Sequence, residues 1–383
     1  MYKNTINIVC QPKVGDVLID ELKELGYEGE LVSPLNARVK GDFNDAMILN
    51  MFLRTANKVL LLIEEFEVSN AEELYEKAKG IAWDQIFKSR GYFSIDSFVK
   101  NDSIVDTRFP NLKLKDAIVD SFQEKYGHRP DAGSKKDATN FFMYWVGDKC
   151  SIYLDTSGAT IAKHGYRKES FKAPVLESLA SALILSSQWD KESNFINPMC
   201  GSGTLSIEAA LIALNKAPGL YRQNFGFMHV LQYNEADWRK ISRMARRKVV
   251  KEDLKFKIIA TDHDPEALKA ARLNAKYAEV DHLIEFSLCD FEETFIPFKN
   301  QGVVFLNPEY GERLGEEPEL EETYARIGDF LKQDCQGYCG YIFTGNLDLA
   351  KKIGLRTTRR IPFNNGQIEC RLLEYELYEG SKK

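Results

Sequence analysis

Apolar and polar residues along the first 65 residues follow the periods of short strands and amphipathic helices. Apolar residues at helical spacing, followed by Gly26, predict a helix that ends at about residue 25. A second helix is expected at 42–53, and strands are expected at 6–9, 31–32, 37–39 and 59–62. This β-α-β-β-α-β order predicts a ferredoxin-like segment over residues 1–65.

A second α+β module is predicted over residues 66–165. Helices are expected at 71–79 and 111–126, and strands at 91–98, 141–146 and 150–155. Gly147 and Asp148 separate the last two strands and indicate a hairpin.

The pattern changes after Pro174, from where strands alternate with helices to the end of the chain. The first helix is expected at 175–187. Buried strands are predicted at 195–196, 257–261, 284–288, 303–306, 340–343 and 372–377. Such alternation predicts an α/β domain over residues 166–383, built on an open parallel sheet with helices on both faces.

Composition is that of a soluble globular protein, with 44% hydrophobic and 28% charged residues over 383 positions. No apolar run approaches the roughly 20 residues of a membrane span, and the N-terminus lacks the apolar core of a secretion signal. The seven cysteines are scattered, as expected of free thiols in the cytoplasm. Only Cys335 and Cys339 lie close together, without a nearby His, and the five histidines are dispersed, so we expect no metal site.

The net charge of −6 conceals a local basic segment between Arg239 and Lys251. A patch of this kind can bind nucleic acid, although a solvated helix face has the same composition. An acidic run at 312–322 follows much later in the chain.

The first candidate site is the stretch Asn197-Pro198-Met199-Cys200-Gly201-Ser202-Gly203-Thr204, which joins a predicted strand to a predicted helix at 205–214. Two glycines permit a tight turn and a close approach of ligand to backbone. The stretch is neither a P-loop nor a dinucleotide fingerprint, since Asp262 lies 262 − 201 = 61 positions past Gly201 instead of about 20. A purely structural turn remains the alternative.

Acidic residues follow the next two strands. Asp262 is placed to bind the ribose hydroxyls of a nucleoside, whereas Asp264, followed by Pro265, fits a helix N-cap. Asp290 follows the third strand, where it could accept a hydrogen bond from an adenine amine or serve as a turn residue.

The second candidate site is Asn307-Pro308-Glu309-Tyr310, directly after a predicted buried strand. An amide oxygen and a Pro carbonyl can accept the hydrogens of an exocyclic amine, and an aromatic ring can stack on its base. An ordinary Pro turn is the alternative. The two sites together indicate a methyltransferase that acts on an amine with S-adenosylmethionine.

These motifs, with residues 155–167, 173–180, 217–220 and 307–314, give the chain its resemblance to a known family. Over essentially its whole length it resembles the THUMP-domain RNA guanine-N2 methyltransferases, in particular the bacterial 23S rRNA large-subunit methyltransferase L group. The resemblance implies a class I, Rossmann-like, seven-stranded methyltransferase domain preceded by ferredoxin-like and THUMP modules.

The resemblance also implies roles for individual residues. Asn307, Pro308 and Tyr310 would orient and stack the guanine. Cofactor contacts would come from Asn197, Pro198, Cys200, Gly201, Gly203, Thr204, Asp262, His263, Asp290, Phe291 and Asn307. RNA contacts would come from Lys135, Lys136, Arg167, Lys168, Arg243, Arg246, Arg247 and Arg313.

Two departures from the family pattern stand out. Asn197 and Met199 replace Asp and Phe of the cofactor motif, and Glu309 replaces the second Pro of Asn-Pro-Pro-Tyr. Asn197 can still bond the methionine amino group of the cofactor. A tRNA guanine or DNA adenine methyltransferase, or a non-catalytic RNA-binding protein that keeps the fold, stays open as an alternative to 23S rRNA methylation.

Overall fold

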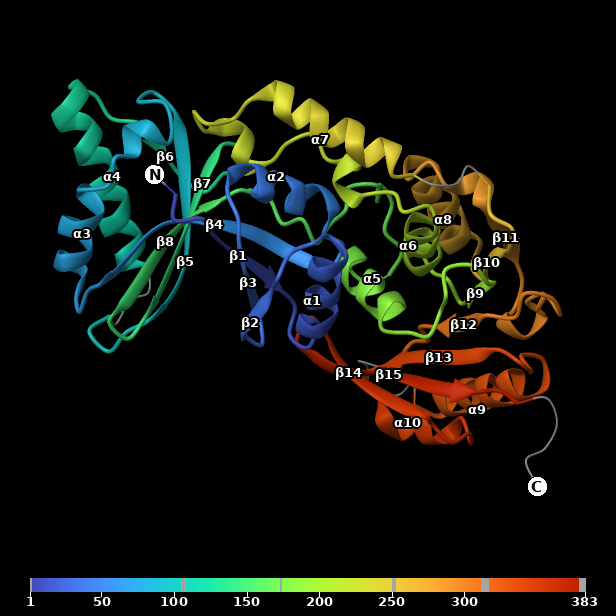
Figure 1. The fold of residues 1–383 in the computed structure, drawn as a ribbon. Coiled ribbons are helices and arrows are strands. Elements are labelled where there is room, and N and C mark those ends of the chain that lie inside the picture. Colours follow the sequence, from blue (N-terminus) through green and yellow to red (C-terminus); the bar gives the residue numbers. More distant parts are fainter. Residues whose placement is uncertain are drawn as a thin grey trace. The chain divides into compact units, whose positions relative to one another are not determined.

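The computed structural model describes residues 2–104, 106, 108–172, 174–249, 253–310 and 317–378. The chain divides into two compact units (Figure 1). The N-terminal unit comprises Met1–Cys10, Leu18–Ile161 and Arg222–Ala245, and the C-terminal unit comprises Gln11–Val17, Ala162–Tyr221 and Arg246–Lys383.

The helices and strands follow the predicted order closely. The helices are α1 (Gly15–Glu24), α2 (Phe43–Phe52), α3 (Ala71–Lys79), α4 (Phe109–Tyr126), α5 (Glu177–Leu185), α6 (Thr204–Ala213), α7 (Glu235–Arg247), α8 (Pro265–Tyr277), α9 (Glu317–Gln333) and α10 (Leu347–Lys352). The strands are β1 (Thr5–Cys10), β2 (Glu30–Ser33), β3 (Asn36–Lys40), β4 (Ala56–Glu67), β5 (Tyr92–Lys100), β6 (Asp131–Ala132), β7 (Thr139–Val146), β8 (Lys149–Asp155), β9 (Phe195–Pro198), β10 (Ile258–Asp262), β11 (Ile284–Leu288), β12 (Val303–Leu306), β13 (Cys339–Thr344), β14 (Arg359–Asn365) and β15 (Ile368–Glu376).

The N-terminal unit is built on one sheet with the strand order β2-β3-β1-β4-β8-β7-β5-β6. The predicted ferredoxin-like and THUMP segments are therefore not separate sheets, because β4 pairs antiparallel with β8 and joins them. β4 is twelve residues long and extends past residue 65, the predicted end of the ferredoxin-like segment. The predicted hairpin around Gly147 is confirmed, since Val146 pairs with Lys149.

Local sequence explains several helix ends in this unit. Asp42 and Asp45 form a capping box at the start of α2. Gly127 ends α4 in the left-handed conformation, with φ of 72°. Aromatic rings of α4 and β7 pack on Phe87, with the ring of Phe122 at 5.0 Å and that of Phe141 at 5.7 Å from it.

The C-terminal unit contains a sheet of seven strands in the order β11-β10-β9-β12-β13-β15-β14. β11, β10, β9, β12 and β13 are mutually parallel. This mixed α/β arrangement confirms the predicted class I, Rossmann-like, seven-stranded fold.

The expectation of a parallel sheet does not hold at one edge. β15 runs antiparallel to β13, and β14, which the pattern did not predict, runs antiparallel to β15. Asn365 pairs with Ile368 across a tight turn that contains Gly366 at φ of 61°, so the last two strands form a hairpin. β14 escaped prediction because it carries Arg359, Arg360 and Pro362, which an edge strand tolerates and a central strand does not.

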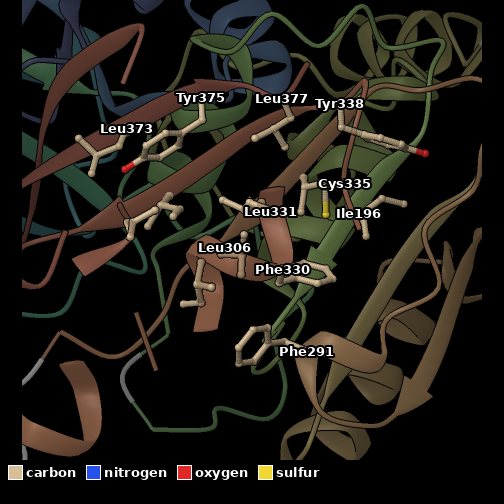
Figure 2. Packing of buried hydrophobic residues seen from close by; sticks show 14 of the residues in the cluster. Ile196, Phe291, Leu306, Phe330, Leu331, Cys335, Tyr338, Leu373, Tyr375 and Leu377 are labelled. Atoms are coloured by element: carbon tan, nitrogen blue, oxygen red, sulfur yellow. The ribbon is translucent and has the colours of Figure 1, made fainter. Parts of the chain in front are cut away.

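A large apolar cluster fills the space between this sheet and α9 (Figure 2). Phe330 and Leu331 of α9 belong to it together with Leu306 of β12 and Leu373 of β15. On the opposite face, Phe195, Phe305 and Tyr341 stack in a row across β9, β12 and β13, with centroid separations of 5.1 and 4.7 Å. Rigid packing on both faces fixes the strand ends that carry the candidate site.

Candidate functional site

The candidate site lies at the carboxyl ends of four adjacent parallel strands, β11, β10, β9 and β12. Open α/β sheets bind their ligands at this edge. Asp290 follows β11, Asp262 ends β10, Pro198 ends β9 and Asn307 follows β12. The sheet order therefore brings together four sequence motifs that are far apart in the chain.

The loop predicted to hold the cofactor, residues 199–203 (the cofactor loop), joins β9 to α6 through alternating left-handed residues. Met199, Gly201 and Gly203 have φ angles of 57°, 55° and 81°. A Cβ at Gly203 would lie 2.9 Å from Cβ of Ala271, so packing against α8 requires glycine there. A Cβ at Gly201 would meet nothing within 4 Å, which leaves open space beside its backbone.

Asp262 connects β10 to the cofactor loop. Its Oδ2 accepts from the Gly201 backbone N–H at 2.8 Å, and its Oδ1 accepts from the Asp264 N–H at 3.0 Å. The side chain is only 8% exposed, yet each oxygen keeps capacity for a further donor. His263 beside it is exposed, with Nδ1 3.8 Å from Asp262 Oδ1.

Asp264 is the N-cap of α8, as predicted. Its side chain accepts from the backbone N–H groups of Glu266 and Ala267, and Pro265 takes the first helical position. The two neighbouring carboxylates thus have different tasks, since Asp264 faces a helix terminus and Asp262 faces the loop.

Asn197 is fully buried, and its amide is used within the fold. Its Nδ2 donates to the Phe305 carbonyl of β12 at 2.8 Å, and its Oδ1 accepts from Ser206 Oγ of α6 at 2.9 Å. Nδ2 is therefore engaged, whereas Oδ1 has taken one of the two hydrogen bonds that an amide oxygen can accept, so the bond from Asn197 to a cofactor amino group stays a prediction. An amide at this position ties two strands and a helix together, which a carboxylate cannot do by donation.

Other residues of the predicted cofactor set also have structural partners. Thr204 Oγ1 accepts a hydrogen bond from the Arg167 guanidinium at 2.9 Å. The Cys200 side chain is buried, which raises the pKa of its thiol. Asp290 forms an ion pair with Arg326 at 3.0 Å. The ring of Phe291 is buried in the apolar cluster of Figure 2, 5.8 Å from Phe330, so it faces the core rather than the site.

Ser202 was not predicted as a site residue, yet its hydroxyl is buried without a hydrogen-bond partner among the described residues. Its backbone carbonyl accepts from Asn274 Nδ2 of α8 at 3.1 Å. Sequence offered no signal for Asn274, because it lies on a helix 72 residues away.

The loop predicted to hold the target base, residues 307–310 (the target-base loop), follows β12. Asn307 Oδ1 is buried and has no hydrogen-bond partner among the described residues. The Tyr310 hydroxyl accepts from Asn365 Nδ2 of β14 at 2.8 Å. Gly345 leaves room for the ring, since a Cβ there would lie 3.2 Å from Tyr310. Neither Asn365 nor Gly345 could be found from the sequence, because only the pairing of β13, β15 and β14 brings them to this loop.

Glu309 points out of the loop into an exposed ion pair with Lys172. Its carboxylate, 57% exposed, is thus engaged by the segment that leads into α5.

The predicted RNA contacts are scattered and differ in availability. Arg167 is 13% exposed and bonds Val175 O, Thr204 and Glu177, which makes it an internal tether instead of a surface cation. Lys136 forms an ion pair with Asp96, and Lys168 lies over the Tyr277 ring at 5.3 Å.

The remaining predicted RNA contacts lie on surfaces or outside the described chain. Lys135 is exposed, as are the last-turn residues of α7, Arg246 and Arg247. Arg243, also exposed, donates to a carbonyl of its own helix. Arg313 lies outside the described residues.

Family models describe this architecture. A methyltransferase domain described as RMKL-like matches residues 164–374, which is more than half of the chain. The chain belongs to the RMKL-like methyltransferase family. A THUMP domain matches residues 68–155 and an RlmL ferredoxin-like domain matches residues 5–60.

Relatives of this RMKL-like methyltransferase cover nearly all of it. A ribosomal RNA large subunit methyltransferase K/L of Syntrophotalea carbinolica is 35% identical over 375 residues, which are 96% of this chain and 52% of that protein. A Synechocystis protein, provisionally named an RNA methyltransferase, is 34% identical with 94% of both chains covered. The chain thus spans about half the length of the K/L relatives that it matches.

Solved structures share the whole fold. A provisionally named methylase from Clostridium difficile aligns over 100% of both chains with a TM-score of 0.87 and 31% identity.

Within the described ranges, no helix combines the length and apolar character that a membrane crossing requires. The same part of the chain holds no group of three His, Cys, Asp or Glu side chains that could bind a metal ion.

Proposed function

We propose that this chain transfers a methyl group from S-adenosylmethionine to the exocyclic N2 amine of a guanine in RNA, with 23S rRNA as the substrate. The observation that carries the proposal is Asn307 Oδ1, a buried acceptor without a partner at the carboxyl end of β12. A buried acceptor of this kind costs about 1–3 kcal/mol unless a donor fills it, and an exocyclic amine is such a donor.

The cofactor would bind at the loop that follows β9. The open space beside Gly201 admits a ligand to the backbone, and the buried Ser202 hydroxyl is free to bond it. Asp262 retains acceptor capacity for ribose hydroxyls. The solved structure of a provisionally named methyltransferase, with a TM-score of 0.89 and 24% identity, is described as complexed with SAH, S-adenosylhomocysteine, the product that such a cofactor leaves.

The cofactor supplies a methyl group on a positively charged sulfur, which an amine can attack directly. The target amine is a poor nucleophile because its lone pair is delocalised into the ring. Asn307 Oδ1 and the Pro308 carbonyl would accept its two hydrogens and hold the lone pair toward the cofactor. The amine becomes acidic as it gains the methyl group, so the site needs no strong base.

Tyr310 would stack on the guanine after the base has left its helix. Its hydroxyl is already fixed by Asn365, so the ring is held before substrate arrives. The THUMP match and the rRNA methyltransferase names of the relatives favour RNA over DNA.

Two measurements test the proposal. Calorimetry should detect binding of S-adenosylhomocysteine to the full chain. Mapping of N2-methylguanine in RNA from a strain that lacks the protein should show one site lost from 23S rRNA, and purified protein should restore it. Loss of a tRNA guanine instead would reassign the substrate, loss of N6-methyladenine from DNA would reassign the reaction, and unchanged nucleic acids would leave an RNA-binding role.

A further inference from the structure

A short segment, residues 167–172 (the strap), lies along the cofactor side of the C-terminal unit and is fixed to it by buried contacts. Asn274 of α8 is 1% exposed, and both polar atoms of its side-chain amide form hydrogen bonds with the backbone of the strap or of the cofactor loop. Its Oδ1 accepts from the N–H groups of Lys168 and Glu169 at 2.9 and 3.0 Å. Its Nδ2 donates to the Glu169 and Ser202 carbonyls at 2.8 and 3.1 Å. The strap and the cofactor loop therefore share one buried amide.

The end of the strap reaches the target-base loop. Lys172 donates from Nζ to the carboxylate of Glu309, 137 positions away in the chain. Lys172 adopts a left-handed backbone with φ of 50°, which is unfavourable for a residue with a Cβ. A contact outside the segment is needed to hold such a residue in place.

The ammonium group of Lys172 interacts with the charges of three carboxylates, those of Glu309, Asp264 and Asp262. Its pKa lies above the usual range because its ammonium donates to Glu309, with the charges of Asp264 and Asp262 adding to the effect. Loss of Lys172 would therefore leave the Glu309 carboxylate without its ion-pair partner.

We infer that Lys172 is a positioning residue for methyl transfer, because its ion pair with Glu309 holds the target-base loop to the strap. The inference rests on the proposed function. The motif that this loop resembles has proline where Glu309 stands, and proline restrains the backbone by itself. Here a side-chain contact supplies the restraint that the missing ring would have given.

A double-mutant cycle with Lys172→Ala and Glu309→Pro tests the inference, since proline should make the ion pair unnecessary. The probes are S-adenosylmethionine and transcribed 23S rRNA under single-turnover conditions. Lys172→Ala should lower the rate by up to about fivefold, the upper end of what an exposed ion pair contributes. The double variant should be as fast as Glu309→Pro alone. Affinity for S-adenosylhomocysteine should not change, because the ion pair restrains the loop that would hold the base and not the cofactor.

The matched control is Lys269→Ala, which removes a lysine from an exposed pair with Glu266 on α8. It should leave the rate unchanged. The inference would be overturned if Lys172→Ala lowered the rate equally in the wild-type chain and in the Glu309→Pro variant, or if it lowered the rate in neither.

Hydrogen exchange of the free protein separates this inference from the proposed function. Lys172→Ala should speed exchange in the peptide 303–310, and Glu309→Pro should suppress that increase. The readout needs no substrate, so it remains decisive even if the wild-type chain neither binds S-adenosylhomocysteine nor methylates RNA. Unchanged exchange on Lys172→Ala would show that the ion pair does not restrain the loop.

Discussion

The carboxylate of Asp262 and the backbone N–H of Gly201 meet at 2.8 Å, although 61 positions separate them in the chain. The contact fixes the cofactor loop to the end of β10. Asp262 therefore has two tasks in the proposed site, because the same carboxylate shapes the loop and would bind the cofactor ribose.

Asp262→Ala should weaken binding of S-adenosylhomocysteine by roughly 1.5–3 kcal/mol, the size of a hydrogen bond to a charged group. Asp264→Ala should leave that affinity unchanged and lower the free energy of unfolding by about 1 kcal/mol, because it removes a helix cap. Calorimetry and urea unfolding of both variants check the pair. The opposite result, with affinity lost only in Asp264→Ala, would reverse the two roles.

Asn307→Ala should reduce the single-turnover rate by about a hundredfold or more, because it removes an acceptor that orients the amine. Cofactor affinity should change little. The free energy of unfolding should not fall through a lost hydrogen bond, since Oδ1 has no partner among the described residues. A variant that is fully active, or whose defect is explained by unfolding, would remove Asn307 from the site.

Tyr310→Phe and Asn365→Ala should slow methyl transfer by similar, small amounts, since each breaks the bond between these two side chains. Such a bond contributes about 0.5–1.5 kcal/mol. Tyr310→Ala should lose more, because base stacking on an aromatic ring contributes about 1–3 kcal/mol. Rates on 23S rRNA test the order, and equal losses in Tyr310→Phe and Tyr310→Ala would argue against stacking.

Arg243→Ala and Arg246→Ala on α7 should each weaken RNA binding and flatten its salt dependence by about 0.7–0.9 in log–log slope. Lys351→Ala on α10, where an exposed lysine pairs with Asp348, is the control. Point variants are preferable to deletion of residues 1–165, which would leave Arg222–Ala245 without the rest of its compact unit. An unchanged slope would identify α7 as an ordinary solvated helix.

Stability in acid should depend on Glu374 of β15. Burial favours its neutral form, but hydrogen bonds from Arg359, Tyr341 and Thr358 outweigh burial and lower its pKa. A folded pKa below the unfolded value of about 4.3 contributes stability above that value, and the contribution is lost as pH falls through the folded pKa.

Glu374→Gln should therefore destabilise the protein at about pH 7, with the difference in unfolding free energy from wild type narrowing as the pH falls below about 4.3. Urea unfolding across this range measures it. Glu376→Gln, an exposed position at the end of the same strand, is the control. A difference that does not vary with pH would contradict the assignment.

The sequence by itself determined the elements whose pattern is local. Periodic apolar residues located the helices α1 to α6 and most of the strands, and Asp264 with Pro265 identified a helix cap. The order of strands and glycine turn indicated the fold and the edge of the sheet that would hold the site. These features were readable because each depends on residues within a few positions of one another.

Only the tertiary structure decided which of the singled-out side chains are available. Asn197 was predicted as a cofactor ligand and Arg167 as an RNA contact, but partners from other elements already bond Asn197 Nδ2 and Arg167 Nη2. Asn365 carried no signal because β14 is an edge strand that meets Tyr310 only through sheet pairing.

Contacts between distant residues join the two N-terminal segments into one sheet. A contact of the same kind pairs Lys172 with Glu309. A hydrogen bond or ion pair between residues far apart in sequence leaves no local periodicity, because its partner is chosen by the packing of the whole chain.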